Sequence, residues 1–266
     1  MTDSPHLFEP WTAREMPTDK QRVTRIGQLC LRERFDGRDF WLASEYLDMG
    51  DGKAEKEGEA KLQWLRWPLN ADFDQVAIRP VFPDRPVVVE TEVPLCLTPE
   101  STTKVYARCP VWVRIELLGK GDPMIIEELP TALLSNTWFG DFIEGTLGYW
   151  VSSRTRTRIE PDPSQPWMAI CPIQVHNTSE IELKIERVCL RVEHLSLFAS
   201  GGQLWADETR VTYRGLDKIS RIQNTGTAPE EAKGAILATA PREPMEHGIT
   251  AKTFASLKVL SHGGAF

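Results

Sequence analysis

Apolar and polar residues alternate with the period of a β-strand along most of the chain, whereas the longer period of an amphipathic helix is scarce. Runs such as 104–108 and 111–118 alternate in this way, and Gly, Pro or Asp occur in the segments between runs. Many short strands separated by closely spaced turns are typical of sandwiches and barrels. The pattern therefore predicts an all-β fold.

The strands expected from this pattern are distributed over the whole sequence. They lie at 28–32, 40–43, 75–79, 86–90, 93–97, 104–108, 111–118, 124–128, from 149 onward, and at 168–175, 181–193, 195–198, 203–205 and 209–213. Asp36-Gly37 predicts a tight hairpin between the first two. At 252–260 three apolar residues are spaced three apart, which predicts a short C-terminal helix.

A proline-rich segment divides the predicted strands into two groups. Residues 160–166 hold three prolines in seven positions and little hydrophobicity, as linkers do. The pattern Cys-Pro-aliphatic-X-Val occurs on both sides, at 109–113 and 171–175. This echo indicates either two related units or a coincidence of five positions. We expect two β-sandwich units, an N-terminal domain over 1–160 and an immunoglobulin-like domain over 161–266.

The charge and the cysteine content restrict the cellular compartment and the classes of binding partner that we expect. The chain has 31 Lys and Arg against 38 Asp and Glu, a net charge of −7 that disfavours nucleic acid as a partner. Its first residues lack the pattern of a signal peptide, and no stretch is apolar enough to span a membrane. Five dispersed cysteines without a Cys-X-X-Cys pair favour reduced thiols over disulfides or a metal site. We expect a cytoplasmic protein that is not embedded in a membrane and has no cofactor.

Four segments occur in an order that resembles a known family. They are Val-Phe-Pro-Asp-Arg-Pro-Val-Val-Val at 81–89, Cys-Pro-Val-Trp-Val at 109–113, Asn-Thr-Trp-Phe-Gly-Asp at 136–141 and Cys-Pro-Ile at 171–173. Together they resemble an uncharacterised prokaryotic family, the domain of unknown function 432, over most of the chain. The resemblance implies a soluble bacterial or archaeal protein, and it carries over no catalytic residue.

Three arginines at alternate positions form the most specific binding signal. If a strand continues from residue 149 to 159, Arg154, Arg156 and Arg158 project from one face. Three guanidinium groups in a row would bind a phosphate or an acidic partner, because each offers a fork of donors. The alternative is a solvated edge strand that its charge protects from aggregation.

A second candidate site combines an aromatic residue with two carboxylates. Trp138, Asp141 and Glu144 lie in a glycine-flanked loop, where the carboxylates could act as general acid and base on a sugar that stacks on the tryptophan. The alternative is a structural corner in which Trp138 packs inward and Asp141 occupies a turn. Of the other tryptophans, Trp41, Trp112, Trp150 and Trp205 fall in strand patterns and are expected to pack in cores.

The sequence lacks the common catalytic signatures. There is no G-x-S-x-G elbow, phosphate-binding loop, dinucleotide fingerprint or H-E-x-x-H pair. The leading hypothesis is therefore a β-sandwich module without catalytic activity, which binds a protein partner or associates with itself. A small anion at the three arginines, or a sugar, is a further candidate ligand. The alternative is a carbohydrate-binding or carbohydrate-active protein with a site at Trp138, Asp141 and Glu144.

Overall fold

The computed structural model confirms the all-β prediction. It describes residues 7–18, 20–47, 62–69, 72–140, 142–143, 145–159, 161–215, 220–244, 249–251 and 254–255. Within these ranges the helices are two single turns of 3₁₀-helix, η2 (Val192–His194) and η3 (Glu230–Ala232). No helix in the described part of the chain has the length and apolar character needed to cross a membrane.

Two compact units divide the chain, and each draws on several separate segments. Unit 1 contains Met1–Val81, Pro110–Leu133 and Ser164–Trp167, and unit 2 contains Phe82–Cys109, Leu134–Pro163 and Met168–Phe266. This division differs from the expected succession of two domains at residue 160. Its physical reason is that distant segments pair within one sheet, a property that local sequence patterns do not report.

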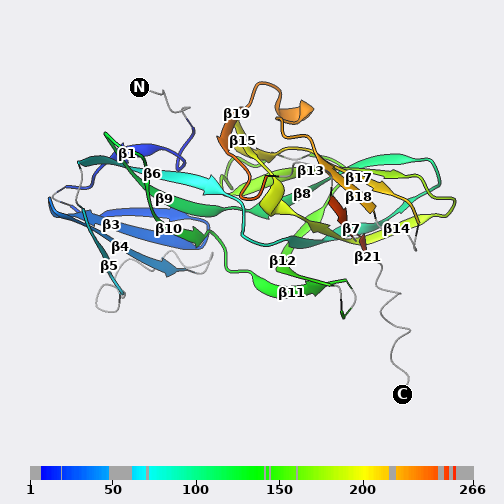
Figure 1. Cartoon of the computed structure of the whole chain (residues 1–266), viewed down its shortest axis with the longest axis horizontal. Helices are drawn as coiled ribbons and strands as arrows, with labels where there is room; N and C mark the ends of the chain where they lie inside the picture. Colours follow the sequence, from blue (N-terminus) through cyan, green and yellow to red (C-terminus); the bar gives the residue numbers. More distant parts are fainter. Residues whose placement is uncertain are drawn as a thin grey trace, which may run out of the picture. The chain divides into compact units, whose positions relative to one another are not determined.

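Unit 1 consists of two antiparallel four-stranded sheets, ordered β1-β6-β9-β10 and β2-β3-β4-β5 (Figure 1). Their strands are β1 (Ala13–Glu15), β2 (Arg22–Ile26), β3 (Leu29–Phe35), β4 (Asp39–Tyr46), β5 (Leu65–Pro68), β6 (Phe73–Val81), β9 (Trp112–Gly119) and β10 (Met124–Pro130). In β9 every second residue is buried, as the period of the sequence predicts. The predicted hairpin at Asp36 joins β3 to β4.

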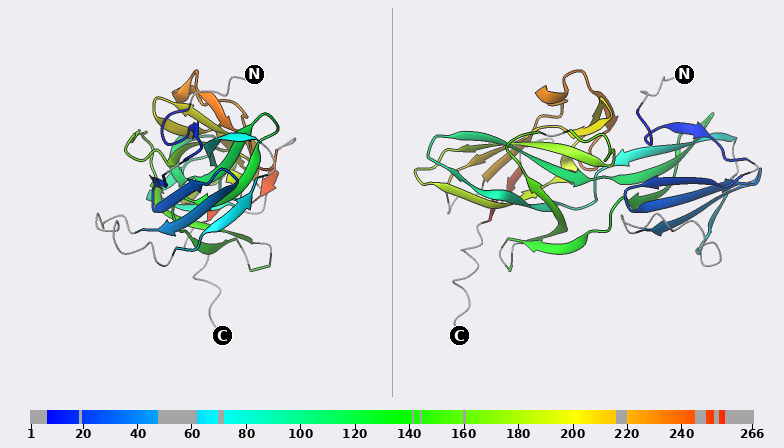
Figure 2. Two further views of the ribbon diagram at one scale, coloured as in Figure 1. Left: turned by 90° about the vertical axis from the view of Figure 1, so that its left-hand side faces the viewer. Right: turned by 180° about the vertical axis from the view of Figure 1, so that it is seen from behind.

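Unit 2 contains a five-stranded sheet, ordered β11-β12-β7-β14-β21, and an eight-stranded sheet. The eight-stranded sheet follows the order β19-β15-β16-β13-β17-β18-β20, with β8 paired to β13 (Figures 1 and 2). The strands are β7 (Val87–Leu97), β8 (Thr102–Pro110), β11 (Ser135–Phe139), β12 (Thr146–Thr155), β13 (Met168–Asn177), β14 (Leu183–Leu190), β15 (Leu197–Ser200), β16 (Gln203–Ala206), β17 (Thr209–Tyr213), β18 (Ser220–Asn224), β19 (Ile236–Thr239), β20 (Ile249–Ala251) and β21 (Phe254–Ala255).

Some pairings in unit 2 are parallel. Strand β12 runs parallel to β7, and β13 runs parallel to both β16 and β17. A parallel pair needs a long crossover between its strands, which explains why these sheets combine segments distant in sequence. The sandwich packing and the immunoglobulin-like character of the C-terminal part stay predictions.

The C-terminal helix expected at 252–260 is wrong where the structure describes it. Phe254–Ala255 forms the short strand β21, which pairs with Val188 and Arg187 of β14. An edge of a sheet offers unpaired backbone groups, and this pairing satisfies them in place of helical bonds. The remaining positions of the predicted helix lie outside the described residues.

Candidate functional site

A bulge near the end of β12 sets the direction of the arginine segment. Val151 pairs with Val89 of β7, but the next pair joins Arg154 to Glu90, so two additional residues are accommodated on β12. After the bulge Arg154 is exposed and Thr155 is buried. The strand ends at Thr155, earlier than the continuation to 159 that the sequence suggests.

A single bridge then joins this segment to β8. Tyr106 donates its backbone N–H to the carbonyl oxygen of Arg156 at 2.8 Å, and Arg156 returns the bond at 2.9 Å. Residues directly opposite in such a pair point to the same face. The side chain of Ser153 reinforces the junction by donating to the carbonyl oxygen of Arg108, two residues further along β8.

These strands enclose a pocket of about 430 Å³ within unit 2. The structure brings all three predicted arginines into its wall. The described residues that line it are Tyr106, Arg108, Ser153, Arg154, Arg156, Arg158, Ile159, Pro161, Asp162 and Ile170. Among the described lining residues, four arginines accompany one carboxylate, so this part of the pocket is basic although the chain as a whole is acidic.

Among the described residues, carboxylates form ion pairs with two of these arginines. Arg108 Nη1 lies 3.7 Å from Asp162 Oδ2, and Arg156 Nε lies 3.6 Å from Glu92 Oε2, both longer than a direct hydrogen bond. Across the described ranges, the side chains of Arg154 and Arg158 have no hydrogen-bond or ion-pair partner. Their donors are therefore available to an anion.

Another part of the pocket wall is apolar. Tyr106, Ile159 and Ile170 line the pocket and also belong to one hydrophobic cluster. The buried centre of this cluster comprises Ile170, Phe198, Trp205 and Ala232. The pocket thus combines guanidinium donors with a surface that continues into the core.

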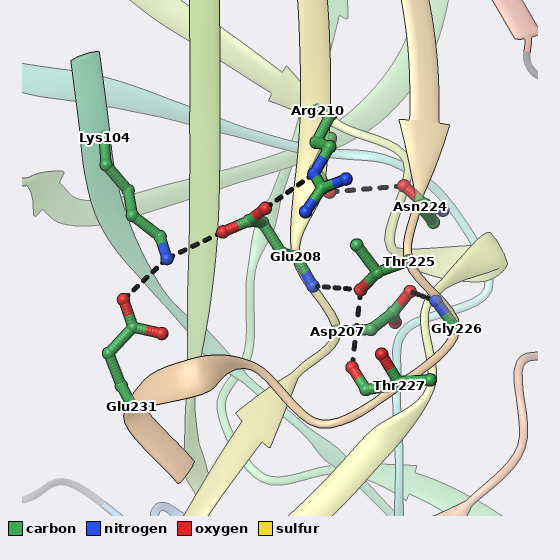
Figure 3. Close-up of polar contacts among 10 residues, drawn as sticks. Lys104, Asp207, Glu208, Arg210, Asn224, Thr225, Gly226, Thr227 and Glu231 are labelled. Carbon is green, nitrogen blue, oxygen red and sulfur yellow. Dashed lines mark hydrogen bonds and ion pairs between the residues drawn. The ribbon is translucent and has the colours of Figure 1, made fainter. Parts of the chain in front are cut away.

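The hydroxyl of Tyr106 belongs to an ionic network, and Figure 3 shows the part of this network that Lys104, Glu208, Arg210 and Glu231 form. The tyrosine hydroxyl donates to Glu231 Oε1 at 2.8 Å. Lys104 Nζ lies 2.6 Å from the same oxygen and 2.6 Å from Glu208 Oε2. Arg210 Nε donates to the other oxygen of Glu208 at 2.8 Å. Five side chains from β8, β17 and η3 and the segments beside them are thereby linked.

The protonation states within this network favour its bonds. Burial raises the pKa of Tyr106 to about 12, with a further contribution from its bond to Glu231, so the hydroxyl stays a donor. Burial alone would lower the pKa of Lys104, but hydrogen bonds to the two glutamates outweigh that effect and raise it. Burial also opposes ionisation of Glu231, yet the bonds from Lys104 and Tyr106 lower its pKa. The lysine and glutamate stay charged at neutral pH.

A buried aspartate anchors the loop that carries η3. Asp207 is 1% exposed, and its two carboxylate oxygens accept the N–H groups of Ser196 at 2.7 Å and Gly226 at 2.9 Å. Figure 3 shows the bond between Gly226 and Asp207 beside the bond between Glu208 N–H and Thr225 Oγ1. Burial raises the pKa of Asp207 to about 6, although both N–H bonds favour the charged form.

The second predicted site is described only in part. Trp138 lies on β11 opposite Leu147 and is 51% exposed, so it does not pack fully inward as the structural alternative expects. Asp141 and Glu144 lie outside the described residues. Between them, Phe142 and Ile143 are 98% and 92% exposed. The pairing of the Asp141 and Glu144 carboxylates therefore stays a prediction.

Sequence reasoning missed several residues of the arginine pocket. Tyr106 and Arg108 occupy alternate positions of a strand that the sequence predicts, and their shared face could have been inferred from that period. Asp162 belongs to the proline-rich segment interpreted as a linker. Its backbone N–H donates to Gln203 Oε1 at 3.2 Å, a contact between distant positions without a local signal.

The described part of the chain contains no group of three His, Cys, Asp or Glu residues that could hold a metal ion. One family model matches residues 10–258, nearly the whole chain. No curated protein and no solved structure matches.

Proposed function

The chain belongs to the DUF432 family, whose members are described only as proteins of unknown function, and from this premise we propose that it is a binding module without catalytic activity whose pocket holds a small anion. The observation that carries the proposal is the pair Arg154 and Arg158, which line the pocket without a partner among the described residues. Guanidinium groups bind phosphate and carboxylate through paired hydrogen bonds.

The chemistry of the pocket supports binding more than catalysis. Its lining holds no histidine or cysteine. The hydroxyl of Ser153 donates to the backbone carbonyl oxygen of Arg108 and not to a base, and the pKa of Tyr106 is raised, not lowered. An activated nucleophile requires an adjacent base or a lowered pKa. The arrangement fits recognition of a charged group.

Inorganic phosphate is expected to raise the melting temperature. A ligand at 100 times its Kd stabilises the folded state by about 2.7 kcal/mol, which corresponds to a shift of several degrees. Differential scanning fluorimetry with phosphate, with chloride at equal ionic strength, and with a neutral oligosaccharide separates the two candidate functions. A shift with phosphate alone supports the anion site. A shift with the oligosaccharide alone contradicts it and favours carbohydrate binding at the exposed Trp138.

We also propose that the protein associates with itself through β11. This strand ends the order of the five-stranded sheet, and Trp138, Phe142 and Ile143 expose apolar surface along its hairpin. An edge strand of this kind can pair with the same strand of a second copy about a two-fold axis.

Sedimentation velocity tests this association. We expect a concentration-dependent dimer for the unaltered protein and a monomer for Phe142→Ser/Ile143→Ser, because the substitutions remove the apolar surface that a dimer would bury. Val93→Ser, at an apolar position of β7 that is 66% exposed, is the control and should still dimerise. A monomer at every concentration of the unaltered protein would refute the proposal.

We further propose that the protein is a cytoplasmic protein of a prokaryote. All five cysteines are free, and four of them are buried. Free thiols in such number are typical of a reducing compartment.

A further inference from the structure

The pocket offers two kinds of surface to one ligand. Arg154, Arg156 and Arg158 supply charged donors, while Tyr106 and Ile159 supply an apolar surface that lies over the buried Ile170. An inorganic anion would use only the first of these. The second surface adds affinity only for a ligand that also carries an apolar group.

The ring of Tyr106 is held in position on this apolar surface, and we call it the platform. Its hydroxyl is tied to Glu231, and Lys104 Nζ lies 5.9 Å from the centre of its ring. Glu208 in turn fixes Lys104 (Figure 3). Because these contacts restrain the ring, stacking on it should cost less conformational entropy than stacking on an unrestrained side chain. Aromatic side chains held in this way bind planar rings through their faces.

The platform and the anion donors are close neighbours. Tyr106 and Arg156 face each other across the bridge that joins β8 to the end of β12. A ligand that meets both therefore has its charged group and its ring separated by a short connection. The volume of about 430 Å³ lies in the range of pockets for small molecules.

One carboxylate adds a further polar contact. Asp162 lines the pocket, and its segment is fixed by the bond of its N–H to Gln203, a buried residue of β16. Next to four arginines, a carboxylate does not favour an anion, but it accepts hydrogen bonds from hydroxyl or amino groups. A ligand with such groups beside its charge could donate to it.

We propose that the ligand is a phosphate ester of a compound with a planar ring and hydroxyl groups, the chemistry of a nucleoside monophosphate. The proposal rests on the proposed anion-binding function. It assigns the phosphate to Arg154, Arg156 and Arg158, the ring to Tyr106, and a hydroxyl or amino group to Asp162.

Isothermal titration calorimetry with four probes measures the contribution of a planar ring in the ligand separately from the contribution of its phosphate. The probes are inorganic phosphate, ribose 5-phosphate, adenosine and adenosine 5′-monophosphate. We expect adenosine 5′-monophosphate to bind about tenfold more tightly than ribose 5-phosphate, the effect of one base–aromatic stack. Equal affinities for these two would overturn the ring assignment and leave the anion site intact. No binding by any phosphate compound would overturn the anion site as well.

A substitution at the platform provides the second test. Tyr106→Leu keeps an apolar side chain but removes the ring, and it should reduce affinity for adenosine 5′-monophosphate about tenfold while ribose 5-phosphate binds as before. Tyr149→Leu is the matched control, because Tyr149 also donates its hydroxyl to a carboxylate, that of Asp84, but does not line the pocket. Equal losses for both probes would contradict a stacking role. The four-probe comparison on the unaltered protein decides the question if the variant does not fold.

Discussion

Replacing Arg154 and Arg158 together with alanine should weaken the binding of adenosine 5′-monophosphate at least about 100-fold. Each hydrogen bond to a charged group contributes about 1.5–3 kcal/mol, and the double substitution removes the donors of two guanidinium groups. Both side chains are exposed and lack partners among the described residues. The melting temperature of the variant without ligand should therefore stay close to that of the unaltered protein. Calorimetric titration measures the affinity directly.

A charge-matched variant distinguishes direct contacts in the pocket from long-range electrostatic attraction of the ligand by the whole protein. Arg214→Ala/Arg221→Ala removes the same charge from exposed positions of unit 2 that do not line the pocket. It should change the affinity by no more than the small amount expected for screened, distant charges. Equal losses in the two double variants would show that net charge, and not the pocket, attracts the ligand.

Stability should decrease as the pH rises from about 4 to about 6, because of Asp207. Its pKa is 3.8 when exposed and about 6 in the folded protein. Between these values the native state keeps a proton that the unfolded chain has lost, so the free energy of unfolding falls with pH. The shift of roughly two pH units corresponds to about 3 kcal/mol. Below this window and above it, Asp207 adds no slope.

Urea unfolding at a series of pH values measures this effect. Asp207→Asn removes the ionisable group, so the difference between the two stability curves should follow the titration of Asp207 alone. Asp122→Asn, an exposed aspartate in the turn between β9 and β10, controls for the loss of one carboxylate. A difference curve that is flat between pH 4 and 6 would show that Asp207 is not held in the buried environment described.

The strands of this protein could be predicted from sequence because their signal is local. The alternation over 111–118 became β9, and the alternation of Arg154 with Thr155 became one exposed and one buried position. The pocket could not be predicted in full, because Tyr106 and Asp162 reach it through pairings between distant segments. The same limit applies to the two units, which are assembled from interleaved parts of the chain.

The tryptophans show the difference between local pattern and packing. Trp11, which lies beside a proline and has no strand pattern, is completely buried and donates its Nε1–H to the carbonyl oxygen of Pro166 at 2.9 Å. Of the four tryptophans expected in cores, Trp205 is buried, whereas Trp41, Trp112 and Trp150 are only partly covered. Trp41 and Trp150 contact arginine side chains through their ring faces. Whether a tryptophan ring is buried therefore depends on which distant segment of the chain packs against it.

A crystal structure of the protein with adenosine 5′-monophosphate tests the central claim most directly. The account predicts density for the phosphate within hydrogen-bond distance of Arg154 and Arg158, with the base against Tyr106. Density for the nucleotide at another site, or an empty pocket at saturating concentration, would contradict it.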